Sequence, residues 1–139
     1  MRALLALVTT SLLLLAACGG QTANTSTSTG PIAVTLTDKG VVLEQTTVNG
    51  GAVTFTVKNA GTVTHELLVV KTDIAQDKIQ VSSDDPNKMS EEGSQGETGD
   101  LAAGESKTIT FNLAPGKYVL MCNQPGHYMV GMHIGFLVK

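Results

Sequence analysis

The sequence predicts an all-β fold, a sandwich or barrel of seven or so short strands. Apolar and polar residues alternate with the period of two that marks half-buried strands. Turn residues, mainly Gly, Asn, Pro and Asp, separate the alternating runs. Thr, Val and Gly are common and Trp is absent, which favours strands and turns over helices. With 139 residues, of which 42% are hydrophobic and 15% charged, the chain suits one domain with a packed core.

The first residues are predicted to be a signal peptide. Arg2 gives a positive start to the apolar run "ALLALVTTSLLLLAA", which is too short and wrongly flanked for a membrane-spanning helix. The run ends in "LAAC", residues 15–18, which resembles the lipoprotein box of bacteria. We therefore expect residues 1–17 to be removed and Cys18 to carry lipid. The alternative is an ordinary signal peptide that leaves Cys18 as an unmodified thiol.

Residues 18–31 are predicted to form a flexible tether, because "GGQTANTSTSTGP" has no apolar side chain large enough to bury. The lipid and the tether would hold a folded domain, residues 32–139, outside the cytoplasmic membrane, in the periplasm or at the cell surface. Without the signal peptide, eight Lys face twelve acidic residues, a formal charge of −4. This charge disfavours binding to nucleic acid.

Seven strands are expected along the domain. The clearest alternation lies in "IAVTL" (32–36), "VTFTVK" (53–58) and "TITFNL" (108–113). The further candidates are "VVLEQTT" (41–47), "HELLVVK" (65–71), "KYVLMC" (117–122) and "IGFLVK" (134–139).

The middle of the domain is expected to be less regular. Residues 72–80 suit a helical turn, and residues 82–99 suit an irregular excursion. Residues 84–100 contain six acidic residues and one lysine. We expect a solvated acidic loop here, and a docking patch for a basic partner is the weaker alternative.

Residues 122–132, "CNQPGHYMVGM", gather ligands that suit a soft metal. Cys122, His127 and Met132 are spaced five residues apart, and a loop between two strands can bring its ends to one point. His65, at the start of a predicted strand, is the best-placed fourth ligand, because alternation turns His133 away from Met132. If Cys18 is lipidated, a bound metal would also explain the unpaired Cys122 in an oxidising compartment.

The donor types favour copper as the metal. Two imidazoles, a thiolate and a weak thioether form the trigonal set with a long axial bond that suits copper. Zinc is the competing metal, although it gains little from a methionine. Met129 is the rival axial ligand to Met132. We expect Met121 to lie in the core and Met89 to be exposed in the acidic excursion.

The pattern C-x4-H-x4-M, with the upstream histidine of "NAGTVTHELLVV", resembles the cupredoxins, the type 1 blue copper proteins. The gap between cysteine and histidine is similar to that of rusticyanin-type and other bacterial plastocyanin-like domains. The resemblance covers about residues 31–139, and it implies a Greek-key β-sandwich of about eight strands with the acidic segment as an insertion. It also implies one copper ion at one end of the sandwich, held by the ligands His65, Cys122, His127 and Met132.

The same resemblance implies one-electron transfer through an exposed His127, with an apolar rim formed by Pro125, Gly126, Tyr128 and Val130. The chain departs from plastocyanin at Glu66, where plastocyanin has an asparagine that ties down the ligand loop. A carboxylate there could stabilise Cu(II), or it could point to solvent.

The expected function is therefore that of a monomeric, lipid-tethered electron carrier. Its partners would be redox proteins that bind transiently, such as a cytochrome, an oxidase or another copper protein. A filled ligand set leaves no position for a substrate, so we expect no enzymatic activity. A copper buffer, chaperone or resistance protein is the alternative, although such proteins tend to have open sites rich in Met or His. A structural or adhesion sandwich without metal is a third possibility.

Overall fold

The computed structural model describes residues 30–139. The predicted signal peptide, Cys18 and most of the predicted tether lie outside these residues. Nine strands and one short 3₁₀ helix are found in the described part of the chain. They are β1 (Ile32–Thr37), β2 (Gly40–Leu43), β3 (Thr47–Val48), β4 (Gly51–Asn59), β5 (Leu68–Lys71), β6 (Ser94–Glu97), β7 (Ser106–Leu113), β8 (Gly116–Met121), η1 (Tyr128–Val130) and β9 (His133–Val138).

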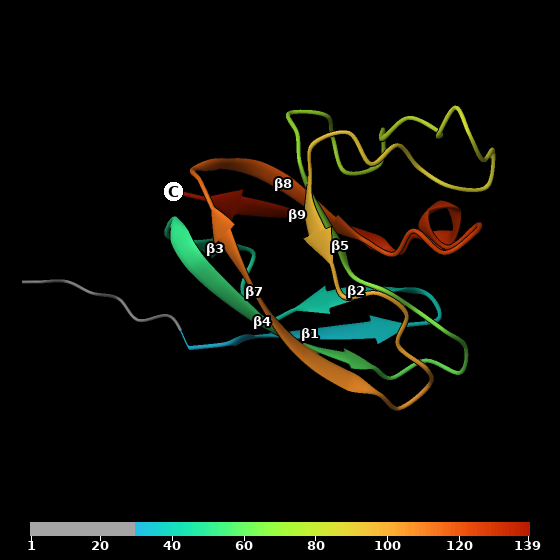
Figure 1. The fold of residues 1–139 in the computed structure, drawn as a ribbon, viewed down its shortest axis with the longest axis horizontal. Helices are drawn as coiled ribbons and strands as arrows, with labels where there is room; N and C mark the ends of the chain where they lie inside the picture. The colour runs from blue at the N-terminus through green and yellow to red at the C-terminus, as the bar shows by residue number, and fades with distance from the viewer. Residues whose placement is uncertain (1–29) are drawn as a thin grey trace, which may run out of the picture.

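The strands form two sheets, which pack face to face (Figure 1). One sheet has the order β2-β1-β4-β7, and the other has the order β3-β9-β8-β5-β6. Most neighbours are antiparallel, but β1 pairs with β4 and β3 pairs with β9 in parallel. The chain passes repeatedly from one sheet to the other, as it does in Greek-key sandwiches. The predicted all-β sandwich is confirmed, with nine strands in the described residues where about eight were expected.

The alternating residues of the sequence divide between the core and the solvent as predicted. In β4, Val53, Phe55 and Val57 are buried between the sheets. The intervening Thr54 and Thr56 face outward, and their hydroxyls pair with those of two threonines on β7 at 2.8 Å and 3.3 Å. Each fully buried apolar side chain of this kind contributes about 1.5–3 kcal/mol to stability. This burial explains why the chain forms a two-layer sandwich.

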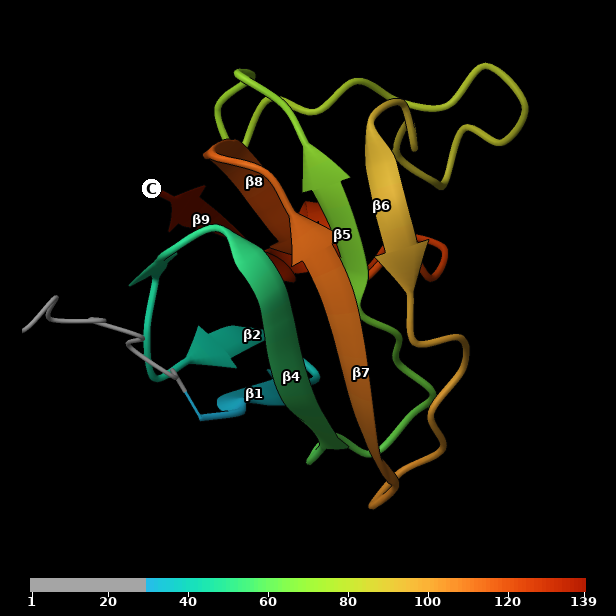
Figure 2. The same cartoon turned by 60° about the vertical axis from the view of Figure 1, so that its left-hand side comes forward.

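A second apolar cluster covers the outer face of the five-stranded sheet. Ile79 and Met89, from the segment between β5 and β6, pack there against side chains of β5 and β8 and against Tyr128. Figure 2 shows this segment beside β5 and β6. The cover is needed because β5 and β8 carry apolar residues on both faces.

Three expectations about this region were wrong. Met89 is buried, with 2% of its surface exposed. Residues 72–80 form turns without a helix. The acidic segment is partly regular, because it contains β6, which pairs with β5. Ile79 and Met89 hold this segment against the apolar outer face of the sheet, and β6 is held by its pairing with β5.

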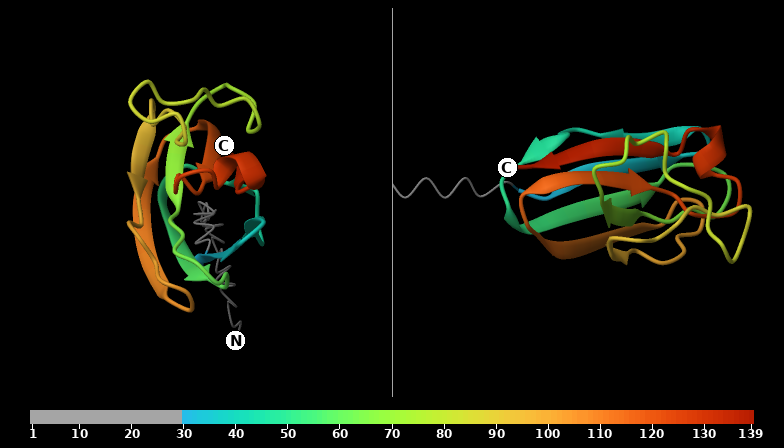
Figure 3. Two further views of the ribbon diagram at one scale, coloured as in Figure 1. Left: turned by 90° about the vertical axis from the view of Figure 1, so that its right-hand side faces the viewer. Right: turned by 90° about the horizontal axis from the view of Figure 1, so that it is seen from above.

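The loops at one end of the sandwich gather the candidate ligands. The loop between β8 and β9, with η1, lies at this end, whereas β1 begins at the opposite end and the C-terminus lies there too (Figures 1 and 3). No helix within residues 30–139 is both long enough and apolar enough to cross a lipid bilayer.

Candidate metal centre

The loop from Cys122 to Met132 is closed by its own backbone. Cys122 follows the last residue of β8, and its N–H donates to the carbonyl of Met132 at 3.0 Å. The N–H of Met132 donates to the carbonyl of His127 at 3.2 Å. Gly131, with φ of 104°, provides the left-handed turn before Met132, where a larger residue would be strained. The predicted convergence of the ends of the loop is therefore present.

His65 is fixed by a short bridge and by a buried asparagine. Its backbone exchanges two hydrogen bonds with Leu101, at 3.1 Å and 2.8 Å. The side-chain amide of Asn59 donates to the carbonyls of Val63 and Leu101 and accepts the N–H of Gly61. Asn59 was missed in the sequence, where only its position before an Ala-Gly turn marks it. It stabilises the approach to His65 by satisfying the polar groups of the loop.

Three of the four predicted ligands meet at one point. The Nδ1 atoms of His65 and His127 are 3.0 Å apart. The sulfur of Cys122 lies 3.8 Å from Nδ1 of His65 and 3.4 Å from Nδ1 of His127. A metal with bonds of about 2.0 Å to nitrogen and about 2.3 Å to sulfur separates such donors by roughly 3–4 Å. The cluster His65–Cys122–His127 therefore fits a metal ion.

The burial of the methionines separates the two axial candidates. Met132 is fully buried, and its backbone touches both Cys122 and His127 through the hydrogen bonds described above. Met129 is 57% exposed on η1, which does not suit a ligand in a buried site. Met121 lies in the outer apolar cluster, as expected of the face opposite Cys122.

His133 does not join the cluster, as predicted from the alternation of neighbours along a strand. Its ring packs against that of Tyr128 with a centroid distance of 4.5 Å. Burial lowers the pKa of His133.

The environment of Cys122 and His127 favours the neutral forms of these two residues before metal binding. Burial raises the pKa of the Cys122 thiol, and the N–H of Glu66, which donates to its sulfur at 3.4 Å, acts in the opposite direction. Burial, together with the nearby His65, lowers the pKa of His127. Neutral imidazoles are ready to bind a metal, and a metal cation would replace the thiol proton.

Glu66, the departure from plastocyanin, is buried and does not point to solvent. Its pKa is raised to about 7, chiefly by burial and then by the charge of Glu97. The charges that act on this pKa all belong to residues of the acidic segment. The sequence did not show this relationship.

Asp38 is a further residue that sequence reasoning missed. Its Oδ1 lies 3.0 Å from Nε2 of His65, the ring nitrogen that faces away from Cys122. The pKa of Asp38 is lowered to about 2 by hydrogen bonds from Thr62 and, to a smaller extent, from His65. In the sequence, Asp38 shows only as a turn residue.

The residues of the predicted rim around His127 differ in their exposure. Pro125 and Val130 are exposed, and Gly126 is partly exposed. Tyr128 is buried, which contradicts its predicted place on the rim. Its hydroxyl donates to the carbonyl of Gln76 at 2.7 Å and accepts the N–H of Ile79 at 3.0 Å. Tyr128 thus anchors the ligand loop to the segment after β5, whereas the neighbouring Met129 is exposed.

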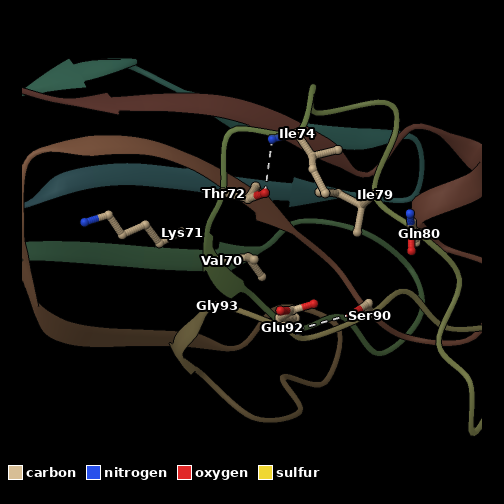
Figure 4. A pocket seen from close by; sticks show the side chains of 9 residues that line it. All are labelled: Val70, Lys71, Thr72, Ile74, Ile79, Gln80, Ser90, Glu92 and Gly93. Carbon is tan, nitrogen blue, oxygen red and sulfur yellow. Dashed lines mark hydrogen bonds between the residues drawn. The ribbon is translucent and has the colours of Figure 1, made fainter.

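One further hollow, with a volume of about 380 Å³, lies between β5 and the segment that covers it (Figure 4). Its lining includes the apolar residues Val70 and Ile79 and the polar residues Ser90 and Glu92. None of the four candidate ligands lines this hollow. Among the described residues, the metal-binding side chains that lie within reach of one another are those of His65, Cys122 and His127.

Comparisons with known proteins agree with this geometry. The family model of the cupredoxin-like domain matches residues 5–134. No curated protein matches the chain significantly. A reduced auracyanin from the photosynthetic bacterium Roseiflexus castenholzii is 26% identical, with a TM-score of 0.57 over 77% of this chain and 94% of that one.

Two further solved structures share the fold at lower identity. Auracyanin A of Chloroflexus aurantiacus, described as a "blue" copper protein, is 21% identical, with a TM-score of 0.52 over 79% of this chain and all of that one. Rusticyanin from Thiobacillus ferrooxidans is 17% identical, with a TM-score of 0.56 over 78% of this chain and 75% of that one. Because the family model spans most of the sequence, the chain belongs to the cupredoxin-like domain family.

Proposed function

We propose that this protein is a one-electron carrier with a single type 1 copper ion. The ligands would be His65, Cys122 and His127, with Met132 as the weak axial ligand. The observation that carries the proposal is the cluster of two imidazole nitrogens and one thiol sulfur, 3.0–3.8 Å apart, in a member of the cupredoxin-like family. Bound copper would supply the change between Cu(II) and Cu(I).

The protein holds the proposed ligands in positions that should change little when copper gains or loses an electron. His65 and Cys122 are fully buried, and their backbones are tied to Leu101 and Met132. Such ties limit rearrangement of the ligands, and burial excludes water from them. A set of four ligands leaves no obvious position for a substrate, so we propose a carrier and not an enzyme.

His127 is the proposed port for electrons. It is the one partly exposed member of the cluster, and Pro125, Met129 and Val130 on the same loop are exposed apolar or weakly polar residues. A few exposed residues around a partly exposed ligand suit a small, transient interface with a redox protein. A copper buffer or chaperone, which must release its metal, would be served better by an open site than by this enclosed one.

We further propose that the domain is tethered outside the cytoplasmic membrane by lipid on Cys18, and that it acts as a monomer. The start of β1 lies at the end of the sandwich opposite the ligand loop (Figure 1). A tether that enters at this end would leave His127 facing away from the membrane. This orientation would keep the port open to soluble or membrane-bound partners.

The decisive experiment is copper titration of the full chain, followed by spectroscopy and voltammetry. A carrier should bind one copper ion, show a strong visible copper–thiolate band, and lose and regain that band as it is reduced and reoxidised. Copper that binds without the band would contradict the proposed ligands. A band with rapid loss of Cu(I) to a mild chelator would instead favour the buffer or chaperone.

A further inference from the structure

The carboxylate of Asp38 is in contact with a candidate copper ligand from the side that faces away from the metal cluster. Its Oδ1 lies 3.0 Å from Nε2 of His65, whose side chain is 1% exposed. We propose that Asp38 is a positioning residue that fixes the tautomer of His65 and strengthens it as a donor to copper. This inference rests on the proposed function.

The tautomer follows from the chemistry of the pair. An ionised carboxylate only accepts hydrogen bonds, so Nε2 of His65 must carry the proton. Nδ1 then has a free lone pair, and it is this atom that lies near His127 and Cys122. A histidine that binds a metal commonly donates its other N–H to a carboxylate or a carbonyl, which fixes the ring and raises its basicity.

Asp38 is itself held in place by Thr62. The N–H of Thr62 donates to Oδ1 of Asp38, and the hydroxyl of Thr62 donates to Oδ2, both at 2.8 Å. Asp38 lies in the turn between β1 and β2, whereas Thr62 and His65 lie between β4 and β5. The carboxylate is therefore oriented by two hydrogen bonds that do not involve the ligand, and this makes it a fixed acceptor for His65.

Gly61 shows how closely this pair is packed. A Cβ atom at position 61 would lie 2.6 Å from Nε2 of His65 and would also collide with Oδ1 of Asp38. Only glycine leaves room for the hydrogen bond between Asp38 and His65. The requirement is steric, since Gly61 does not adopt a left-handed backbone.

The negative charge of Asp38 should stabilise Cu(II) relative to Cu(I). A carboxylate that accepts a hydrogen bond from the imidazole of a ligand increases electron donation from that imidazole to copper. Its charge also attracts Cu(II) more than Cu(I). The side chain of Asp38 is 39% exposed, so water screens the charge in part without removing it. We therefore expect Asp38 to lower the reduction potential.

Two substitutions separate the charge of Asp38 from its hydrogen bond. Asp38→Asn keeps an acceptor oxygen but removes the charge, so the potential should rise while His65 keeps its Nε2–H tautomer. Asp38→Ala removes both, so His65 should lose its single tautomer and the potential should also rise. Asp73→Asn is the matched control, because the side chain of Asp73 is exposed and pairs with Lys117 at 3.7 Å, away from the candidate ligands.

The experiment measures the potentials by voltammetry of the copper-loaded full chain, and the tautomer by nitrogen NMR of the copper-free full chain. Equal potentials in Asp38→Asn and Asp73→Asn would overturn the proposal, and so would an unchanged His65 tautomer in Asp38→Ala. The NMR readout needs no copper. It therefore still tests Asp38 if the wild-type protein has no reversible couple, a result that would reject the proposed function instead.

Discussion

The backbone N–H of Glu66 donates to the sulfur of Cys122 at 3.4 Å, so the residue after one candidate ligand binds the next ligand directly. The resemblance to plastocyanin implied an asparagine at this position that ties the ligand loop down, and Glu66 stands there instead. Here a main-chain hydrogen bond links the segment before β5 to the end of β8. A substitution at position 66 keeps this link, because every residue except proline has the N–H group.

Replacing Cys122 by serine should abolish the copper–thiolate band and leave the sandwich folded. The thiolate supplies the band, whereas the fold depends on apolar residues of the two sheets. Cys122 is fully buried, and a hydroxyl is close to a thiol in size. Absorption and circular dichroism spectra of purified Cys122→Ser check this. A strong visible band in the folded variant would exclude Cys122 as a ligand.

Replacing Met132 by leucine should keep copper bound and raise the reduction potential. The loss of a weak axial donor disfavours Cu(II) more than Cu(I). Met129→Leu is the matched control, because the side chain of Met129 is 57% exposed. The reduction potential of this variant should stay close to that of the wild type. Voltammetry of both variants decides the question. A large shift in Met129→Leu with none in Met132→Leu would reverse the axial assignment.

Replacing Tyr128 by phenylalanine should destabilise the copper-free protein by about 1–3 kcal/mol, because the buried N–H of Ile79 would lose its partner. Tyr118→Phe is a useful comparison. Its hydroxyl makes a single bond, to the carbonyl of Ala114, and its loss leaves no buried N–H unpaired. Urea unfolding of both variants measures the difference. Equal stability of Tyr128→Phe and the wild type would show that this hydroxyl does not anchor the loop.

The negative charge of the acidic segment should attract small cationic oxidants to the electron port at His127 and repel anionic ones. It lies beside the ligand loop, because Gly126 donates its N–H to Asn87 and Gln124 donates to Asp100 at 2.7 Å. The reduced protein should therefore react with a cationic cobalt complex faster than it would without this electrostatic attraction. The advantage should fall with added salt, since screening acts over about 10 Å at 0.1 M ionic strength.

Asp100→Asn tests this steering, because an amide oxygen can still accept the hydrogen bond from Gln124. Stopped-flow rates should fall with the cationic oxidant and rise with ferricyanide. The matched control is again Asp73→Asn, which removes the same charge from a different site. If both variants change the rates equally, the effect comes from net charge and not from the acidic segment.

The sequence predicted the parts of the molecule that depend on short-range patterns. Strands β1, β4 and β7 were found because one face of each is polar, and the ligands of the loop were found because they lie within eleven residues of one another. Strands β5 and β8 are apolar on both faces, so alternation could not show that a covering segment exists. Asp38 was missed because its partner is 27 residues away, and only the packing of two loops brings them together.

Cys18→Ala should block lipidation and keep the protein out of the membrane-anchored lipoprotein pool, because Cys18 would be the attachment point. Lipoprotein anchors carry several acyl chains, and more than one chain is needed for stable attachment to a bilayer. A chain that begins at Thr29 should still bind copper, since every proposed ligand follows β1, which starts at Ile32. Membrane fractionation and mass spectrometry of the native N-terminus provide the measurement. An unmodified mature protein in the soluble extracytoplasmic fraction would reject the anchor and indicate a diffusible carrier, whereas the copper assignment would be unaffected.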